Sequence, residues 1–214
     1  MRERQFREER SCMVTKAVDT LLQFVLRASR VDGARLDEPF DVARRFATLD
    51  QMTEGRLAVH VISGGSDADQ RKDGDYLAHD ERYARTDEYL DILKQVWTSD
   101  GPVSHRGVYY QFEGAESDIK PRQQPRLPIF FGGSSDAAIA VGARHADTYM
   151  VWGEPLADVR QTIARVREAA AREGRTVNFS VSFRPILGKT EDEAWWRAGV
   201  IHRSIVASRP APPR

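Results

Sequence analysis

The chain has 214 residues with 32 lysines and arginines against 32 aspartates and glutamates, and the resulting net charge of zero argues against nucleic-acid or membrane partners, which favour a basic excess. Cys12 is the single cysteine, which excludes an internal disulfide framework or a cysteine-based zinc site. No apolar run approaches the roughly 20 residues that span a bilayer, and the charged N-terminal stretch is not typical of a secretory signal, so we expect a cytoplasmic protein.

Apolar patterning predicts an alternation of strands and helices along the chain. Short runs rich in valine, isoleucine and phenylalanine indicate buried strands, whereas apolar residues three or four positions apart indicate helices. In chain order the expected elements are strand 21–29, helix 39–52, strand 56–62, helix 80–99, strand 127–131, helix 136–146, strand 147–152, helix 156–172, strand 177–187 and a helix from 190. Such alternation requires parallel strands joined by right-handed crossovers, so the predicted fold class is α/β.

The remaining stretches fall outside this alternation. Residues 67–80 are polar and contain glycine, which predicts a loop, and residues 103–120 predict a short hairpin or excursion. Residues 1–20 alternate charges without a sustained apolar face, and we expect an atypical, disordered N-terminus there. Residues 204–214 have the composition of a disordered tail, which leaves 21–203 as one domain.

The stretch from Leu127 to Ala138 carries the strongest local signal for a ligand. An apolar strand runs into two glycines, and the serines that follow are typical of a helix N-cap. Glycine lets the backbone approach a ligand closely, and a helix N-terminus offers unpaired N–H groups, so Gly133, Ser134 and Ser135 could hold a phosphate. The alternative interpretation is an ordinary βα turn, because the fuller dinucleotide and P-loop patterns are absent.

Five separate motifs follow one another along the chain, at residues 46–57, 62–67, 79–83, 128–136 and 149–155. In this order they resemble the luciferase-like flavin monooxygenases, a TIM-barrel family that includes the alkanesulfonate monooxygenases. The resemblance covers roughly residues 40–196. The resemblance implies a TIM (β/α)₈ barrel type that is incomplete here, with about five of eight units present and the first two strands and the last unit lacking.

The resemblance also implies a cofactor, a reaction and partners. Members of the family use reduced FMN, delivered by a separate flavin reductase, to activate O₂ and oxidise a small organic substrate. The matching positions that would bind FMN are Ser63, Gly64, His79, Tyr83, Gly133, Ser134 and Ser135. Apart from the resemblance, Tyr83 is interpreted as a core aromatic and His79 as a loop histidine. The scattered histidines predict no metal site, and a homo-oligomer is compatible with this kind of chain.

One departure from the family bears on the substrate. The alkanesulfonate enzymes carry an Arg-x-His pair on the strand that matches 177–187, and the corresponding residues here are Ser182 and Arg184. Arg184 is the candidate catalytic residue, as a cation facing an anionic substrate. The expected function is an FMN-dependent monooxygenase acting on a small organic, organosulfur substrate. A sulfone or another small organosulfur compound fits this expectation as well as a sulfonate does.

Two other classes of function remain as alternatives. A truncated, catalytically inactive flavin-binding remnant or a partner-binding fragment would keep the motifs without turnover. An unrelated phosphate-ligand enzyme, such as a sugar-phosphate isomerase or aldolase, would need a lysine or paired carboxylates at strand ends. Lys189 lies beyond its strand and no carboxylate pair stands out, so this alternative ranks last.

Overall fold

The computed structural model describes residues 23–27, 38–64 and 66–208. The N-terminal segment 1–20, for which we predicted disorder, lies outside the described residues. Five strands form one parallel sheet in the spatial order β1-β2-β5-β6-β7. They are β1 (Gln23–Arg27), β2 (Ala58–Ile62), β5 (Ile129–Gly132), β6 (Thr148–Trp152) and β7 (Asn178–Ser182). The α/β class with parallel strands is confirmed.

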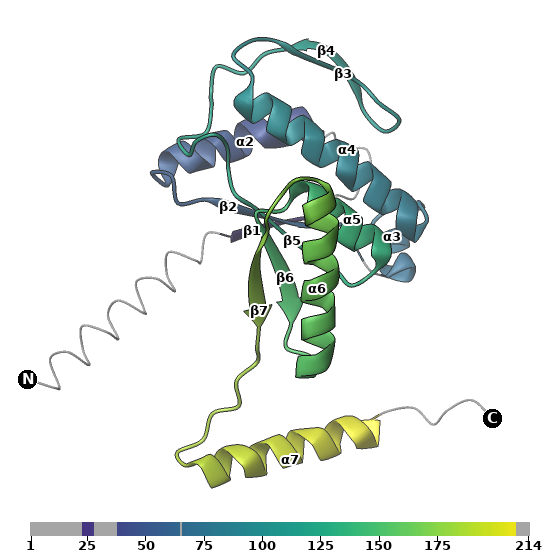
Figure 1. The fold of residues 1–214 in the computed structure, drawn as a ribbon, viewed down its shortest axis with the longest axis vertical. Coiled ribbons are helices and arrows are strands. Elements are labelled where there is room, and N and C mark those ends of the chain that lie inside the picture. Colours follow the sequence, from purple (N-terminus) through teal and green to yellow (C-terminus); the bar gives the residue numbers. More distant parts are fainter. Residues whose placement is uncertain (1–22, 28–37, 65, 209–214) are drawn as a thin grey trace, which may run out of the picture.

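Helices connect the strands and form a layer on one face of this sheet. The helices of this layer are α2 (Pro39–Met52), α4 (His79–Thr98), α5 (Asp136–His145) and α6 (Leu156–Arg172). The other described helices are the short α3 (Asp67–Lys72), between β2 and α4, and α7 (Glu191–Ser208), which follows β7. The spatial strand order follows the chain without reversal, so each right-handed crossover places its helix on the same face. Accordingly α2, α4, α5 and α6 pack in series, as the wall of a (β/α) barrel does (Figure 1).

Side chains alternate between the two faces of each strand. Val59 and Val61 of β2 and Phe131 of β5 are fully buried beneath the helices. On the opposite face, His60 and Phe130 pair in register and are only partly buried. That face would point to the axis of a closed barrel, and it remains half-exposed because the described strands do not close. The expectation of an incomplete TIM-type barrel is confirmed.

The excursion predicted within 103–120 is an antiparallel hairpin of β3 (Val103–Arg106) and β4 (Gln111–Ala115). Glu88 of α4 anchors its turn, because its carboxylate accepts backbone N–H groups from residues 108, 109 and 110. Burial pushes the pKa of Glu88 upward, but these hydrogen bonds outweigh it and hold the pKa below its ordinary value. The hairpin is thereby tied to the outer side of α4.

Several boundaries differ from the sequence-based expectations. The loop predicted for 67–80 contains the short helix α3, which begins because the Ser66 side chain accepts the N–H of Asp69. The strand predicted for 177–187 ends at Ser182, whose carbonyl accepts the last backbone bond, from Gly153. Pro185 follows shortly and cannot donate to a ladder, which opposes further pairing.

The last helix stands apart from the rest of the chain. α7 extends through Ser208, five residues into the stretch 204–214 for which disorder was expected, and residues 209–214 lie outside the described part. None of the described side chains of α7 is buried, and Trp195 and Trp196 are 70% and 66% exposed. Figure 1 shows α7 at the end of an extended linker, away from the sheet and its helices. No helix within the described ranges has the length and apolarity needed to cross a membrane.

The exposed linker before α7 predicts where proteases attack first. Phe183 and Leu187 are 71% and 73% exposed, whereas Phe131 is fully buried. Chymotrypsin should therefore cut at Phe183 or Leu187 well before Phe131, because cleavage requires an accessible, locally unfolded backbone. Mass spectrometry of the earliest fragments checks this. If the linker resisted cleavage for as long as the site at Phe131 does, another surface would have to cover the linker and α7.

Candidate cofactor site

Residues predicted to bind the cofactor lie at one edge of the sheet. Ser63 and Gly64 directly follow β2, and Gly133 directly follows β5. Because β2 and β5 are parallel neighbours, their carboxyl ends meet at the same edge. Ligands of open α/β sheets and of TIM barrels bind at this edge. The fold thus collects these residues at the place where a ligand is expected.

The turn after β5 has no room for a side chain at Gly133. An added Cβ would lie 2.5 Å from Cβ of Ala138 and 3.2 Å from the hydroxyl oxygen of Tyr83. The Gly133 carbonyl accepts a hydrogen bond from the Tyr149 hydroxyl at 2.9 Å, which fixes the turn. Burial raises the pKa of Tyr149, so this hydroxyl keeps its proton. The result is a rigid stretch of backbone that a ligand can approach closely.

The N-terminus of α5 follows this turn. Ser135 is the N-cap, and its side chain accepts the N–H of Ala138 at 3.2 Å, while Ser134 is exposed. Asp136 in the first turn would repel an anion, but it forms an ion pair with Arg165 of α6. With that carboxylate compensated, the partial positive charge of the helix N-terminus remains available to an anionic group.

The first turn of α4 brings two further predicted residues to the same place. The Tyr83 hydroxyl lies beside the Ser135 side chain, and burial, partly offset by this neighbour, raises the pKa of Tyr83. Tyr83 is therefore protonated at neutral pH and can donate to a ligand. The rings of His79 and Tyr83 lie 4.9 Å apart, and Nδ1 of His79 is 2.7 Å from the Asp80 carboxylate. Tyr83, His79, Gly133 and Ser135 consequently form one cluster.

The Ser63 side chain, which was predicted to bind the cofactor, is hydrogen-bonded within the protein instead. Its side chain is buried, with its hydroxyl oxygen 2.8 Å from that of Thr86. The Thr86 hydroxyl donates its proton to the Arg82 carbonyl, so Ser63 must be the donor toward Thr86. The Ser63 hydroxyl is therefore committed to the protein. Beside it, Gly64 adopts φ +86°, and an added Cβ there would lie 2.4 Å from Nε2 of Gln70.

Arg184 is not brought into this cluster. It follows the end of β7, its side chain is exposed, and it forms no hydrogen bond or ion pair with the described residues. Conversely, the structure assigns contacts that the sequence did not single out, from Tyr149 to Gly133 and from Arg82 to the loop after β2. Arg82 lies within the motif 79–83, so its position in the sequence was the available signal. Tyr149 begins the motif 149–155, so the same signal was available for it.

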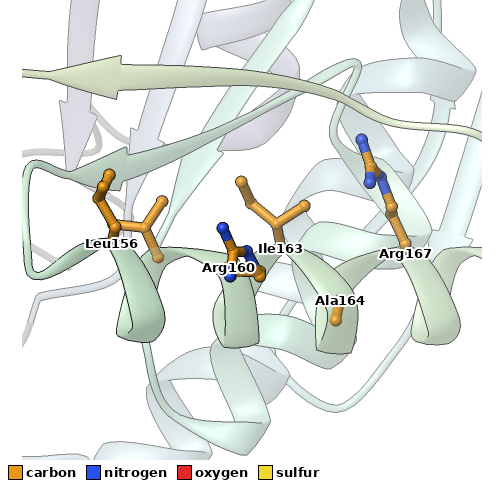
Figure 2. Close-up of a pocket in the computed structure, with 6 residues that line it drawn as sticks. Leu156, Arg160, Ile163, Ala164 and Arg167 are labelled. Atoms are coloured by element: carbon orange, nitrogen blue, oxygen red, sulfur yellow. The ribbon is translucent and has the colours of Figure 1, made fainter.

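A separate pocket of about 340 Å³ lies along α6. Figure 2 shows its lining, which includes Leu156, Ile163 and the two arginines Arg160 and Arg167. The Arg167 guanidinium lies 5.3 Å from the centre of the Phe179 ring of β7. All lining residues belong to α6, and none belongs to the cofactor cluster. In a complete helix layer the next helix would cover this surface.

One cluster in the described part of the chain has the composition of a metal site: Asp87, Asp91 and His145, with ligand atoms within 4.8 Å of one another. Nδ1 of His145 lies 2.7 Å from Nζ of Lys94 and Nε2 lies 2.8 Å from the Asp87 carboxylate. Both ring nitrogens are thus engaged. Burial lowers the pKa of His145 and lowers that of Lys94 to about 8. We interpret the group as a network that joins α4 to α5.

The family model described as luciferase-like monooxygenase matches residues 35–212. The chain therefore belongs to the luciferase-like monooxygenase family, whose members are flavin-dependent enzymes.

Solved structures with a similar fold include riboflavin lyase (21% identity, TM-score 0.72, covering 85% of this chain and 45% of that one). EDTA monooxygenase from Chelativorans sp. BNC1 has 22% identity and TM-score 0.70, with 85% and 48% of the two chains covered. A long-chain alkane monooxygenase has 22% identity and TM-score 0.70, with 85% and 46% covered. The chain thus spans about half the length of these similar structures.

The close packing around Gly133 predicts the effect of a single methyl group. Gly133→Ala should lower the free energy of unfolding by about 1–3 kcal/mol, because its Cβ would overlap Ala138 and press on Tyr83. Gly101→Ala is the matched control, since an added Cβ meets nothing within 4 Å there, and its effect should stay within about 0.5 kcal/mol. Urea denaturation measures both. Equal stability of the two variants would contradict the packing described for the turn.

Proposed function

We propose that the chain binds FMN at the α5 N-terminus and acts in the oxidation of a small organic substrate of the organosulfur class. The observation that carries this proposal is the convergence of the Gly133–Ser135 turn with Tyr83 and His79 at the carboxyl edge of a sheet of this family. Backbone N–H groups, a serine hydroxyl and a protonated tyrosine are donors, as an anionic phosphate requires.

The cluster favours a flavin mononucleotide over a dinucleotide. One helix N-terminus and one glycine turn can hold a single phosphate, whereas a dinucleotide normally brings a fuller glycine pattern and an acidic ribose ligand. The riboflavin lyase structure contains a modified FMN, which supports this choice. A fold similar at TM-score 0.66, a tetrahydromethanopterin reductase from Methanopyrus kandleri, depends on coenzyme F420. F420 is therefore the second cofactor to test.

Each residue of the cluster would have a defined task. The Gly133 turn with Ser134 and Ser135 would hold the phosphate, while the Tyr83 hydroxyl and the His79 ring would orient the cofactor. Reduced FMN, when bound, supplies the electrons with which O₂ is activated. A separate flavin reductase in the cytoplasm would deliver it. Ser63 and Gly64 would line the site through their backbone, because the Ser63 hydroxyl is committed to Thr86.

Arg184 would act on the substrate rather than on the cofactor. Its exposed guanidinium near the carboxyl end of β7 offers a positive charge to a sulfonate or sulfinate group. The alternative is a flavin-binding remnant without turnover. It is favoured by the exposure of Trp152 and Phe183, 66% and 71%, at the same edge of the sheet.

Flavin binding tests the proposed site directly. FMN should bind the purified protein more tightly than FAD, measured by quenching of flavin fluorescence. Ser135→Asp should weaken FMN binding roughly tenfold or more, because like charges about 4 Å apart repel by about 1–4 kcal/mol. Aspartate is also a good N-cap, so the helix should be retained. Thr176→Asp, at an exposed position before β7, is the control with little effect. Equal losses in the two variants would place the phosphate elsewhere.

Turnover by a protein of residues 1–214 should be poorly coupled. The inner face of the described sheet is half-exposed, so water can reach a flavin that an active monooxygenase would shield. With a reductase, NADH and a panel of sulfonates and sulfones, hydrogen peroxide release should exceed formation of sulfite or sulfinate. Tightly coupled product formation by a monomer would contradict this expectation.

A further inference from the structure

Arg82, in the first turns of α4, is a buried charged residue with no role assigned so far. Its side chain has 0% relative exposure. Removing a guanidinium from water costs several kcal/mol unless its N–H groups find strong acceptors. The acceptors that the fold provides for Arg82 therefore indicate what this residue holds together.

Those acceptors belong to two separate connections. Nη1 donates to the Leu77 carbonyl at 2.7 Å, just before α4. Nη2 donates to the Gly64 carbonyl at 3.3 Å and to the Asp67 carboxylate at 2.8 Å, both after β2. A guanidinium is planar and presents its donors in a fixed fork, so these bonds define a geometry as well as an attraction. A lysine ammonium cannot reproduce that fork.

Both connections contain or lead into residues predicted to bind the cofactor. The turn after β2 contains Ser63 and Gly64, and the chain after Leu77 enters the α4 turn with His79 and Tyr83. Gly64 is held from its other side by the amide of Gln70, which leaves no space even for a methyl group. The contacts with Gln70 and Arg82 therefore fix the direction of the Gly64 carbonyl.

We propose that Arg82 is the positioning residue of the cofactor site. It fixes the Ser63–Gly64 turn against the first turn of α4 and so sets the spacing between these two parts of the site. The inference rests on the proposed function, because it assumes that a flavin lies between them. Arg82 itself is fully buried, so it acts through the loops it holds and does not contact the cofactor.

Arg82→Lys tests the proposal, because it keeps the charge but removes the fork. The dissociation constant for FMN should rise about tenfold, the usual size of a supporting-residue effect. In the protein without flavin, amide hydrogen exchange should accelerate at residues 63–67 and 77–80 but not in β5 or β6. Asp67→Asn keeps an acceptor oxygen but removes its negative charge, at a half-exposed position. It should fold normally and shift both readouts in the same direction by less, which keeps the test valid if Arg82→Lys is unstable.

Arg175→Lys is the matched control. The Arg175 guanidinium also donates to two backbone carbonyls, of Ala143 at 2.8 Å and Ala146 at 2.9 Å, but it lies near the amino-terminal ends of the strands. It should leave FMN affinity and exchange at 63–67 unchanged. Unchanged affinity and exchange in Arg82→Lys, or an equal loss of affinity in Arg175→Lys, would overturn the proposal. If the wild-type protein binds no FMN but only Arg82→Lys accelerates exchange at both segments, the proposed function fails and the positioning of the two loops stands.

Discussion

Parallel pairing of the strands in chain order is the constraint on which the rest of the structure depends. Each strand after β1 adds to the same edge of the growing sheet, so every right-handed crossover returns on the same side. This places α2, α4, α5 and α6 in one layer on the same face of the sheet. It also brings all carboxyl ends to one edge, where loops far apart in sequence become neighbours. The candidate site is a direct consequence of this arrangement.

Within that frame, α4 is the element that joins the parts of the site. It packs between α2 and α5. Its first turns reach in two directions, with Tyr83 beside Ser135 at the start of α5 and Arg82 bonded to the turn after β2. Three connections are therefore tied together by side chains of one helix. Rigid support of this kind is what a binding site needs, because loops alone rarely hold donors in place.

The same constraint explains the exposed parts of the chain. A barrel removes strand edges only by closing, and the described strands leave the outer edge of β7 without a partner among the described residues. The pocket on α6 lies on the helix that precedes β7, and the exposed side chains of α7 follow β7 in the chain. Similar solved structures are about twice as long, and only 45–48% of their length is covered. In a closed barrel, further strands would pair with the open edge of β7.

The sequence by itself determined the order and type of nearly all elements. Periodicity and caps are local properties, so α2, α5 and α6 were predicted close to their observed bounds, as was the glycine turn at Gly133. It also indicated the family, because its motifs are contiguous. Tertiary structure decided what depends on distant partners: the end of β7, which follows from its pairing with β6, and the exposure of Arg184. The same holds for the buried bonds of Ser63 and Arg82, since their acceptors lie up to 23 residues away and become neighbours only when the strands pair.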